Sequence, residues 1–282
     1  MKSLLRWLAW GGAGVAVAAV LLAAGVLVAS ELEIQKRWPD TGSPVRAAIG
    51  PEAVARGERL ATLYGCKDCH HADLRGGIFF DHPEVARLWA ANLTLDAAED
   101  TDADLTRAIR TGLADDGRPL IGMPSEAFSR LSDAEVADIL AFVRSKPKGG
   151  NRQPGPAIGP VGRMGVLARQ YMSAPRAVAD ARRRPIPSYG PGFEAGREVV
   201  RACVECHGAD LHGDKTVGSP DLMIAASYSL PDFERLLRTG VASQGRRLGL
   251  MSEAAPGRFN VLTHEQIAAL HAYLTERAVR AP

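Results

Sequence analysis

The amino-acid sequence predicts an all-α protein in which one N-terminal membrane-spanning helix precedes two tandem copies of the same helical unit. Three observations lead to this prediction: one long uncharged stretch, a set of short motifs that occurs twice in the same order, and apolar residues at helical spacing. The 282 residues are 46% hydrophobic and 23% charged, which is typical of a folded protein. The net charge of +2 gives no reason to expect a nucleic-acid partner.

The uncharged stretch covers residues 7–29. It is long enough to cross a hydrocarbon core of about 30 Å at 1.5 Å per residue. Two basic residues precede it and two acidic residues follow it, so residues 1–30 are predicted to anchor the chain in a bacterial inner membrane, with the rest in the periplasm. A cleaved signal sequence, with a small-residue site at residues 28–30, is the alternative, but signal cores usually have only about 7 to 15 residues.

The repeat is most visible at the cysteines. All four lie in two Cys-x-x-Cys-His pentapeptides, residues 66–70 and 203–207, and each pentapeptide is soon followed by Ala-Asp-Leu. An Arg-Thr-Gly segment recurs at residues 110–112 and 238–240, followed in both copies by a Gly-Arg pair and a methionine. The offset between the copies falls from 137 to 128 residues, which predicts a longer loop in the first copy, around residues 79–95.

Each copy is expected to contain short helices joined by loops, without strands of any length. Apolar residues face one side of the expected helices, which should end at Gly112 and Gly240, and capping boxes are expected at Ser132 and Thr263. The linker carries eight basic residues and one acidic residue, whereas the first domain has an excess of acidic residues. It is expected to lack a core of its own, and it either lies along the first domain or is a solvated tether. The predicted segments are an anchor (1–30), a tether (31–50), a first domain (51–147), a Pro/Gly/Arg-rich linker (148–187) and a second domain (188–282).

The pentapeptides predict the cofactor. Two thiols at this spacing match the two vinyl groups of haem, and the adjoining histidine supplies an imidazole to the iron from the same side. A zinc site or a redox dithiol is the alternative, but a distance of 137 residues argues against a shared zinc ion. Two covalently bound haem c groups are therefore predicted, held by Cys66, Cys69, Cys203 and Cys206, with His70 and His207 as iron ligands.

The second axial ligand decides what such a haem can do. Met123 and Met251 are equivalent in the two copies, and each is expected in a loop between helices. A thioether opposite an imidazole gives a six-coordinate iron with a raised potential and no open position, which suits electron transfer. His82 is an alternative ligand in the longer loop. An acidic run at residues 96–104 is either a docking site for a basic partner or a solvated helix start.

These motifs resemble those of the tandem class I cytochromes c, especially the membrane-anchored cytochrome c subunits of periplasmic dehydrogenases. The resemblance covers about residues 51–147 and 188–282 and implies two class I cytochrome c domains. It also implies that each proximal imidazole donates to a proline carbonyl, for which Pro83 and Pro220 are the candidates.

The same resemblance implies a crossing between the first and last helices of each domain. The aromatic residues Phe142 and Tyr273 would lie at these crossings, where Gly57 and Gly196 would allow close approach.

The function that follows is electron transfer between a dehydrogenase or quinol-oxidising complex and a downstream cytochrome or terminal oxidase. The expected partners are these redox proteins and the membrane, and no catalytic side chain is predicted. A dihaem enzyme, such as a peroxidase or a sulfur-compound oxidoreductase, is the alternative. It would need an iron with an open position, and the matched methionines argue against one. The better-known dehydrogenase subunits of this type carry three haem units, and this chain has two pentapeptides.

Overall fold

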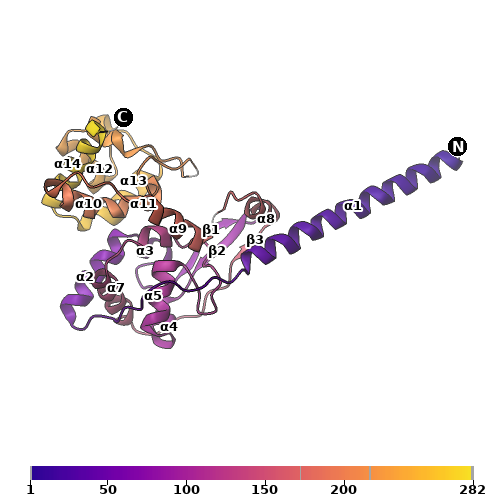
Figure 1. Cartoon of the computed structure of the whole chain (residues 1–282), viewed down its shortest axis with the longest axis horizontal. Helices are drawn as coiled ribbons and strands as arrows, with labels where there is room; N and C mark the ends of the chain where they lie inside the picture. Colours follow the sequence, from indigo (N-terminus) through magenta and orange to yellow (C-terminus); the bar gives the residue numbers. More distant parts are fainter. Residues whose placement is uncertain (1, 172, 216, 281–282) are drawn as a thin grey trace.

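The structure is a computed structural model that describes residues 2–171, 173–215 and 217–280. It consists of a long N-terminal helix and two helical domains that pack against one another (Figure 1). Helix α9 (Ala174–Arg183), which precedes the second domain, lies where the two domains meet.

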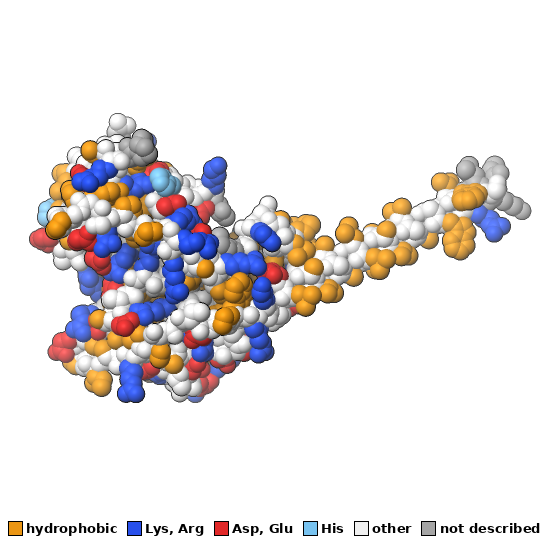
Figure 2. Space-filling model, viewed as in Figure 1, with side chains coloured by type: hydrophobic (Ala, Val, Ile, Leu, Met, Phe, Trp, Pro, Cys, Tyr) orange, Lys and Arg blue, Asp and Glu red, His pale blue; other side chains and the backbone are white. Residues whose placement is uncertain are grey.

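Helix α1 (Lys2–Ile34) projects from the body (Figure 1). Its segment Arg6–Ile34 has a mean hydropathy of 2.4 over its most apolar window, and none of that window is buried. Figure 2 shows hydrophobic side chains along the projecting length and a basic side chain near its free end. By length and composition this helix can cross a membrane, and signal sequences share both properties.

In the first domain, helices α2 (Pro51–Leu63) and α7 (Asp133–Arg144) cross. A side chain at Gly57 would run into the backbone of Asp138 and the Cβ atom of Phe142, which confirms the expected close approach. The other helices of this domain are α3 (Cys66–His70), α4 (Leu93–Glu99), α5 (Asp102–Thr111) and α6 (Ser125–Phe128).

The longer loop of the first domain is a β-hairpin, which corrects the expectation of no strands. Strand β1 (Gly77–His82) pairs antiparallel with β2 (Ala86–Ala90), with a bulge between Ile78 and Phe80. The short strand β3 (Ala157–Ile158), from the linker, adds to the other side of β2. The fold remains mostly helical, and among the described residues the sheet consists of this hairpin and the linker strand β3.

The linker is more ordered than expected. It forms β3, helix α8 (Pro160–Leu167) and helix α9, whose Ala174, Val178 and Ala181 are buried against the first domain. Its basic residues pair in part with the acidic first domain, as Lys148 and Arg152 do with Glu99. The arginines at the end of α9 do not follow this pattern, since Arg184 pairs with Asp180 and Asp210.

The tether also lies against the first domain. The backbone of Val45 exchanges hydrogen bonds with the Thr106 hydroxyl, and the Ala47 amide donates to Asp102 across 2.8 Å. Tether and linker therefore hold the base of α1 to the body.

The second domain repeats the pattern of the first with 3₁₀ turns in place of the hairpin. At the crossing of its first and last long helices, a side chain on Gly196 would meet the Ala269 carbonyl and the Cβ atom of Tyr273, as expected. Its α-helices are α10 (Glu194–Val200), α11 (Val204–His207), α12 (Leu230–Thr239), α13 (Leu250–Arg258) and α14 (His264–Arg280). Its 3₁₀ helices are η1 (Pro191–Phe193), η2 (Arg201–Cys203), η3 (Leu222–Ser227), η4 (Ser243–Gly245) and η5 (Phe259–Val261).

The predicted helix boundaries are confirmed in both domains. Helices α5 and α12 end at Gly112 and Gly240, whose φ angles of 65° and 70° are left-handed. Ser132 and Thr263 form the expected capping boxes with Glu135 and Gln266.

Candidate haem-binding sites

The first Cys-x-x-Cys-His segment forms the single turn α3. Gly65, with a φ of 71°, turns the chain from α2 into this segment. The thiols of Cys66 and Cys69 are free and only partly exposed. Burial raises the pKa of Cys66 to about 12 and that of Cys69 to about 11, and the carboxylate of Glu205 in the other domain adds to both shifts. The two attachment segments are therefore close enough to interact electrostatically.

The second segment spans the end of η2 and helix α11. Its cysteines, Cys203 and Cys206, are also free, and burial raises the pKa of Cys203 to about 12. Both segments thus present a pair of neutral, unbridged thiols one helical turn apart. This is the form from which two thioether bonds to one haem can be made.

The two histidines have fixed orientations. His70 Nδ1 lies 2.8 Å from the carbonyl oxygen of Ala91, and His207 Nδ1 lies 2.9 Å from that of Pro220. A carbonyl oxygen only accepts, so each Nδ1 carries the proton and each Nε2 keeps its lone pair. Burial lowers the pKa of both imidazoles, against the effect of these hydrogen bonds, and favours the neutral form that ligates iron.

The acceptor for His207 is the expected Pro220, but Pro83 is not the acceptor for His70. Pro83 lies in the turn of the β-hairpin, which displaces it, and Ala91 takes the equivalent place at the end of β2. The equivalence is visible in the backbone. Gly76 and Gly213 each donate to their proximal histidine's carbonyl and pass close to the acceptor segment. The hairpin is therefore an insertion between two turns that both domains share.

The two candidate methionines follow equivalent loops. After α5 and α12, isolated bridges join Leu113 to Pro119 and Val241 to Arg247, and each loop then reaches its methionine. Met123 and Met251 are partly buried against the hydrophobic core. Met123 lies in a loop as expected, whereas Met251 lies in the first turn of α13, which corrects the expectation of a second loop position.

A buried serine fixes each of these loops. The Ser125 hydroxyl donates to the Ala108 carbonyl across 3.2 Å, and the Ser252 hydroxyl donates to the Gly240 carbonyl. Both serines are almost fully buried. The chain on the carboxyl side of each methionine is therefore tied to the preceding helix, α5 or α12.

The other candidates are placed elsewhere. His82 is exposed at the end of β1, where its ring packs against Phe80. Most of the acidic run is paired within the chain. Asp96 and Glu99 pair with Arg152, Asp102 pairs with Arg144, and Asp104 caps α5 and pairs with Arg107.

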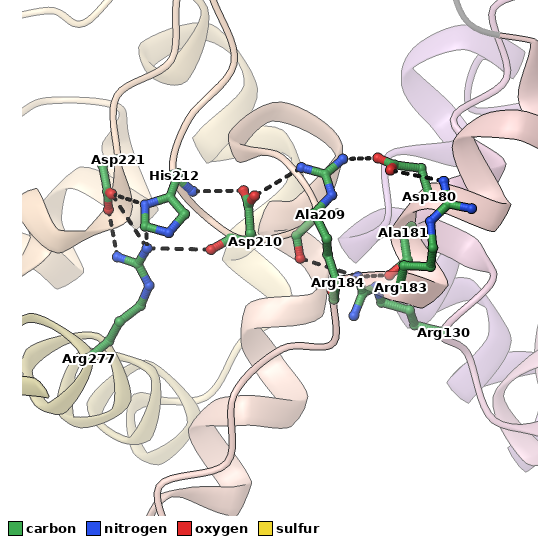
Figure 3. A network of polar contacts seen from close by, with 10 residues as sticks. All are labelled: Arg130, Asp180, Ala181, Arg183, Arg184, Ala209, Asp210, His212, Asp221 and Arg277. Carbon is green, nitrogen blue, oxygen red and sulfur yellow. Dashed lines mark hydrogen bonds and ion pairs between the residues drawn. The ribbon is translucent and has the colours of Figure 1, made fainter. Parts of the chain in front are cut away.

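A polar network supports the loop that holds His207. Buried Arg277 of α14 donates to Asp221, the residue after Pro220, across 2.5 Å, and Asp221 in turn lies 2.6 Å from Nδ1 of His212 (Figure 3). The network continues through Asp210 to Arg184 of the linker. Burial opposes ionisation of Asp221, but hydrogen bonds from Arg277, the Met223 amide and His212 outweigh it and lower the pKa of Asp221 to about 2.

The residues present fit a covalently held haem in each domain. Each domain offers two free thiols, an imidazole with a free Nε2, and a methionine that follows an equivalent bridged loop. Among the described residues, no three histidine, cysteine or acidic side chains gather as a metal site would require. The donor set matches the haem interpretation, with one imidazole from the protein at each pair of thiols.

Comparison with known proteins places this donor set in a family. The sequence matches the cytochrome c family over residues 54–147 and 193–277, more than half of the chain. The chain belongs to the cytochrome c family. Each match contains one attachment segment and one candidate methionine, so this is a cytochrome with two cytochrome c domains.

The cytochrome is also similar to the fructose dehydrogenase cytochrome subunit of Gluconobacter japonicus. The two are 24% identical over 268 residues, which cover 82% of this chain and 54% of the relative. The cytochrome thus spans about half the length of the curated relative that it matches.

Sequence reasoning missed Ala91 and the Arg277 network. A short apolar run with a proline at its end gave little indication of a hairpin. The pairing of Arg277 with Asp221 joins residues 56 positions apart and has no local pattern.

Proposed function

We propose that this protein is a membrane-anchored dihaem electron carrier. It takes electrons from a dehydrogenase or quinol-oxidising complex and passes them to a downstream cytochrome or terminal oxidase. Each domain binds one haem c through its cysteine pair, Cys66 with Cys69 and Cys203 with Cys206. The iron ligands are His70 with Met123 and His207 with Met251.

One observation carries this proposal: the two domains repeat the same ligand arrangement. In both, the proximal Nδ1 donates to a backbone carbonyl, and a methionine follows an equivalent bridged loop. An enzyme would require the two irons to differ, since one must bind substrate. Matched ligands instead support two closed sites that only gain and lose electrons.

The protein residues have distinct roles in this mechanism. When bound, haem supplies a one-electron couple at its iron. The Ala91 and Pro220 carbonyls hold the imidazoles with Nε2 free for the metal. Ser125 and Ser252 tie the chain after each methionine to the body of its domain, so that Met123 and Met251 would be held in place as ligands of a bound haem.

The contacts of α1 support a retained anchor. The helix continues without a break past the small-residue site, and Ser30 within that site is fully buried. Arg163 of α8 donates to Ser30 and pairs with Glu31 at 2.9 Å, while Arg176 of α9 pairs with Glu33 at 2.8 Å. Cleavage after Ser30 would remove the contact between Arg163 and Ser30, whereas a retained helix keeps it. We propose a single pass through the bacterial inner membrane, with both domains in the periplasm.

The similarity to a dehydrogenase cytochrome subunit supports a dehydrogenase as the electron donor.

The test is spectroscopy of the purified, oxidised full chain in detergent. Absorption and electron paramagnetic resonance spectra are recorded before and after addition of hydrogen peroxide. Two low-spin haems that peroxide leaves unchanged are the expected result. A high-spin haem that reacts with peroxide would overturn the carrier function and indicate a dihaem peroxidase.

A further inference from the structure

Arg258 contacts both haem-attachment segments at once. It ends helix α13, and its Nε atom donates to Asp68 across 2.6 Å while Nη1 donates to Glu205 across 2.5 Å. Asp68 and Glu205 occupy the same position, the third residue, of the two pentapeptides. A single guanidinium group therefore pairs with equivalent acidic residues of the two domains.

This arginine is buried at the domain interface. It is 9% exposed, and helices α11 and α13 lie on the side of the second domain that faces the first (Figure 1). The first domain makes room for it at Gly65, where any side chain would collide with the guanidinium group. The repeat does not account for Arg258. The equivalent capping residues Ser132 and Thr263 are 131 positions apart, so Ala127 lies at the corresponding position of the first domain.

Other polar contacts close the interface around Arg258. Arg59 of α2 donates to the Val261 carbonyl across 3.0 Å, and Arg201 of η2 pairs with Glu135 at 2.8 Å. Arg130 donates to the Ala209 carbonyl, just after the second pentapeptide. None of these other contacts joins the two pentapeptides directly, as the Arg258 pairs do.

We propose that Arg258 is a positioning residue that holds the two haem-attachment segments together, so that electrons pass directly between the two haems. This inference rests on the proposed carrier function. Thioether bonds would tie one edge of each bound haem to its cysteines, so two adjoining segments would bring two haem edges towards each other. In each exchange one electron leaves a ferrous iron and reduces a ferric iron, and no bond or proton is transferred.

The charges explain why an arginine is needed. Asp68 and Glu205 would repel each other across the interface if no cation lay between them. The planar guanidinium presents donors on several sides and keeps its charge at every relevant pH, whereas a lysine offers a single charged point. Removal of the cation leaves two carboxylates face to face in a partly buried site, which is strongly unfavourable.

The test uses the haem-loaded full chain with Arg258→Gln, and Arg235→Gln as a matched control. Arg235 is an arginine of the same domain that pairs with Asp232 and donates to the Ala242 carbonyl, both of which lie within that domain. The protein is first reduced in part and then photoreduced further. The rate of electron exchange between the two haems is recorded. The midpoint potentials are then measured by optical titration. We expect Arg258→Gln to slow exchange on the order of tenfold and to lower both potentials, with each haem's own spectrum unchanged.

The inference is overturned if Arg258→Gln exchanges electrons at the wild-type rate, or if Arg235→Gln slows the exchange equally. If Arg258→Gln does not fold, Glu205→Gln removes one arm of the bridge and is expected to slow exchange as well; a wild-type rate there would also overturn the inference. Failure of the proposed function can be told apart from failure of this inference, because it would appear in the wild-type protein as a haem that is not low-spin.

Discussion

His207 donates from Nδ1 to the carbonyl oxygen of Pro220 across 2.9 Å, and buried Arg277 holds the adjoining Asp221. The same loop thus orients the proximal ligand and is fixed by an ion pair. In the first domain the corresponding acceptor, Ala91, is held instead by the β-hairpin. The two domains reach one ligand geometry by different supports.

Loss of the Arg277 ion pair should destabilise the second domain. We expect Arg277→Met to lower the free energy of unfolding by about 2 to 3 kcal/mol, because it leaves the Asp221 carboxylate without its main partner. Arg280→Gln, which breaks an exposed pair with Glu276 in the same helix, should cost at most about 0.5 kcal/mol. Urea denaturation followed by circular dichroism measures both. Equal effects would contradict a special role for Arg277.

The same carboxylate gives a pH dependence. The pKa of Asp221 is about 2 in the folded chain, below its ordinary value of 3.8. Its contribution to stability is therefore complete above about pH 4 and is lost as pH falls towards 2. Asp221→Asn should be less stable than wild type at pH 6 and should lose less stability between pH 4 and pH 2. Parallel acid-unfolding curves for the two proteins would refute this assignment.

The close helix crossings predict a strong effect from a single methyl group. Gly57→Ala and Gly196→Ala should each destabilise the chain by about 1 to 3 kcal/mol, because the added carbon meets the backbone of the crossing helix. Gly192→Ala is the control, since a side chain there meets no atom within 4 Å, and it should be neutral or slightly stabilising. Thermal unfolding of the three variants checks the order, and a Gly57→Ala protein as stable as the control would be incompatible with the packing described.

A retained anchor predicts the mass of the mature protein. Intact mass spectrometry of the protein from solubilised membranes should show a chain that still contains residues 1–30. Carbonate washing should leave this protein in the membrane pellet. A mature chain that begins at Glu31, released into the soluble fraction, would show that α1 is a signal sequence.

The sequence predicted those parts of the fold that depend on local pattern. The two helix ends at Gly112 and Gly240 and the capping boxes at Ser132 and Thr263 follow from neighbouring residues alone, and the structure confirms them. The Gly57 crossing came with the family resemblance and is also confirmed.

The parts of the structure that the sequence did not reveal depend on contacts between residues that lie far apart in the sequence. The hairpin β1–β2 has too short and irregular an alternation to predict strands. The family resemblance therefore points to Pro83 as the acceptor, whereas the structure places Ala91 there. Arg258 and Asp68 lie 190 positions apart, and only the docking of the two domains brings them together. Met251 is expected in a loop but lies in a helix, because α13 begins one residue before it.

The central claim is that each domain holds one haem between a histidine and a methionine. It is tested most directly by the absorption and electron paramagnetic resonance spectra of oxidised wild type, Met123→Ala and Met251→Ala. We predict two low-spin haems in the wild type and the loss of one low-spin signal in each variant, with the other signal intact and the potential of the altered haem lowered. Two unchanged low-spin signals in either variant would contradict the ligand assignment for that domain.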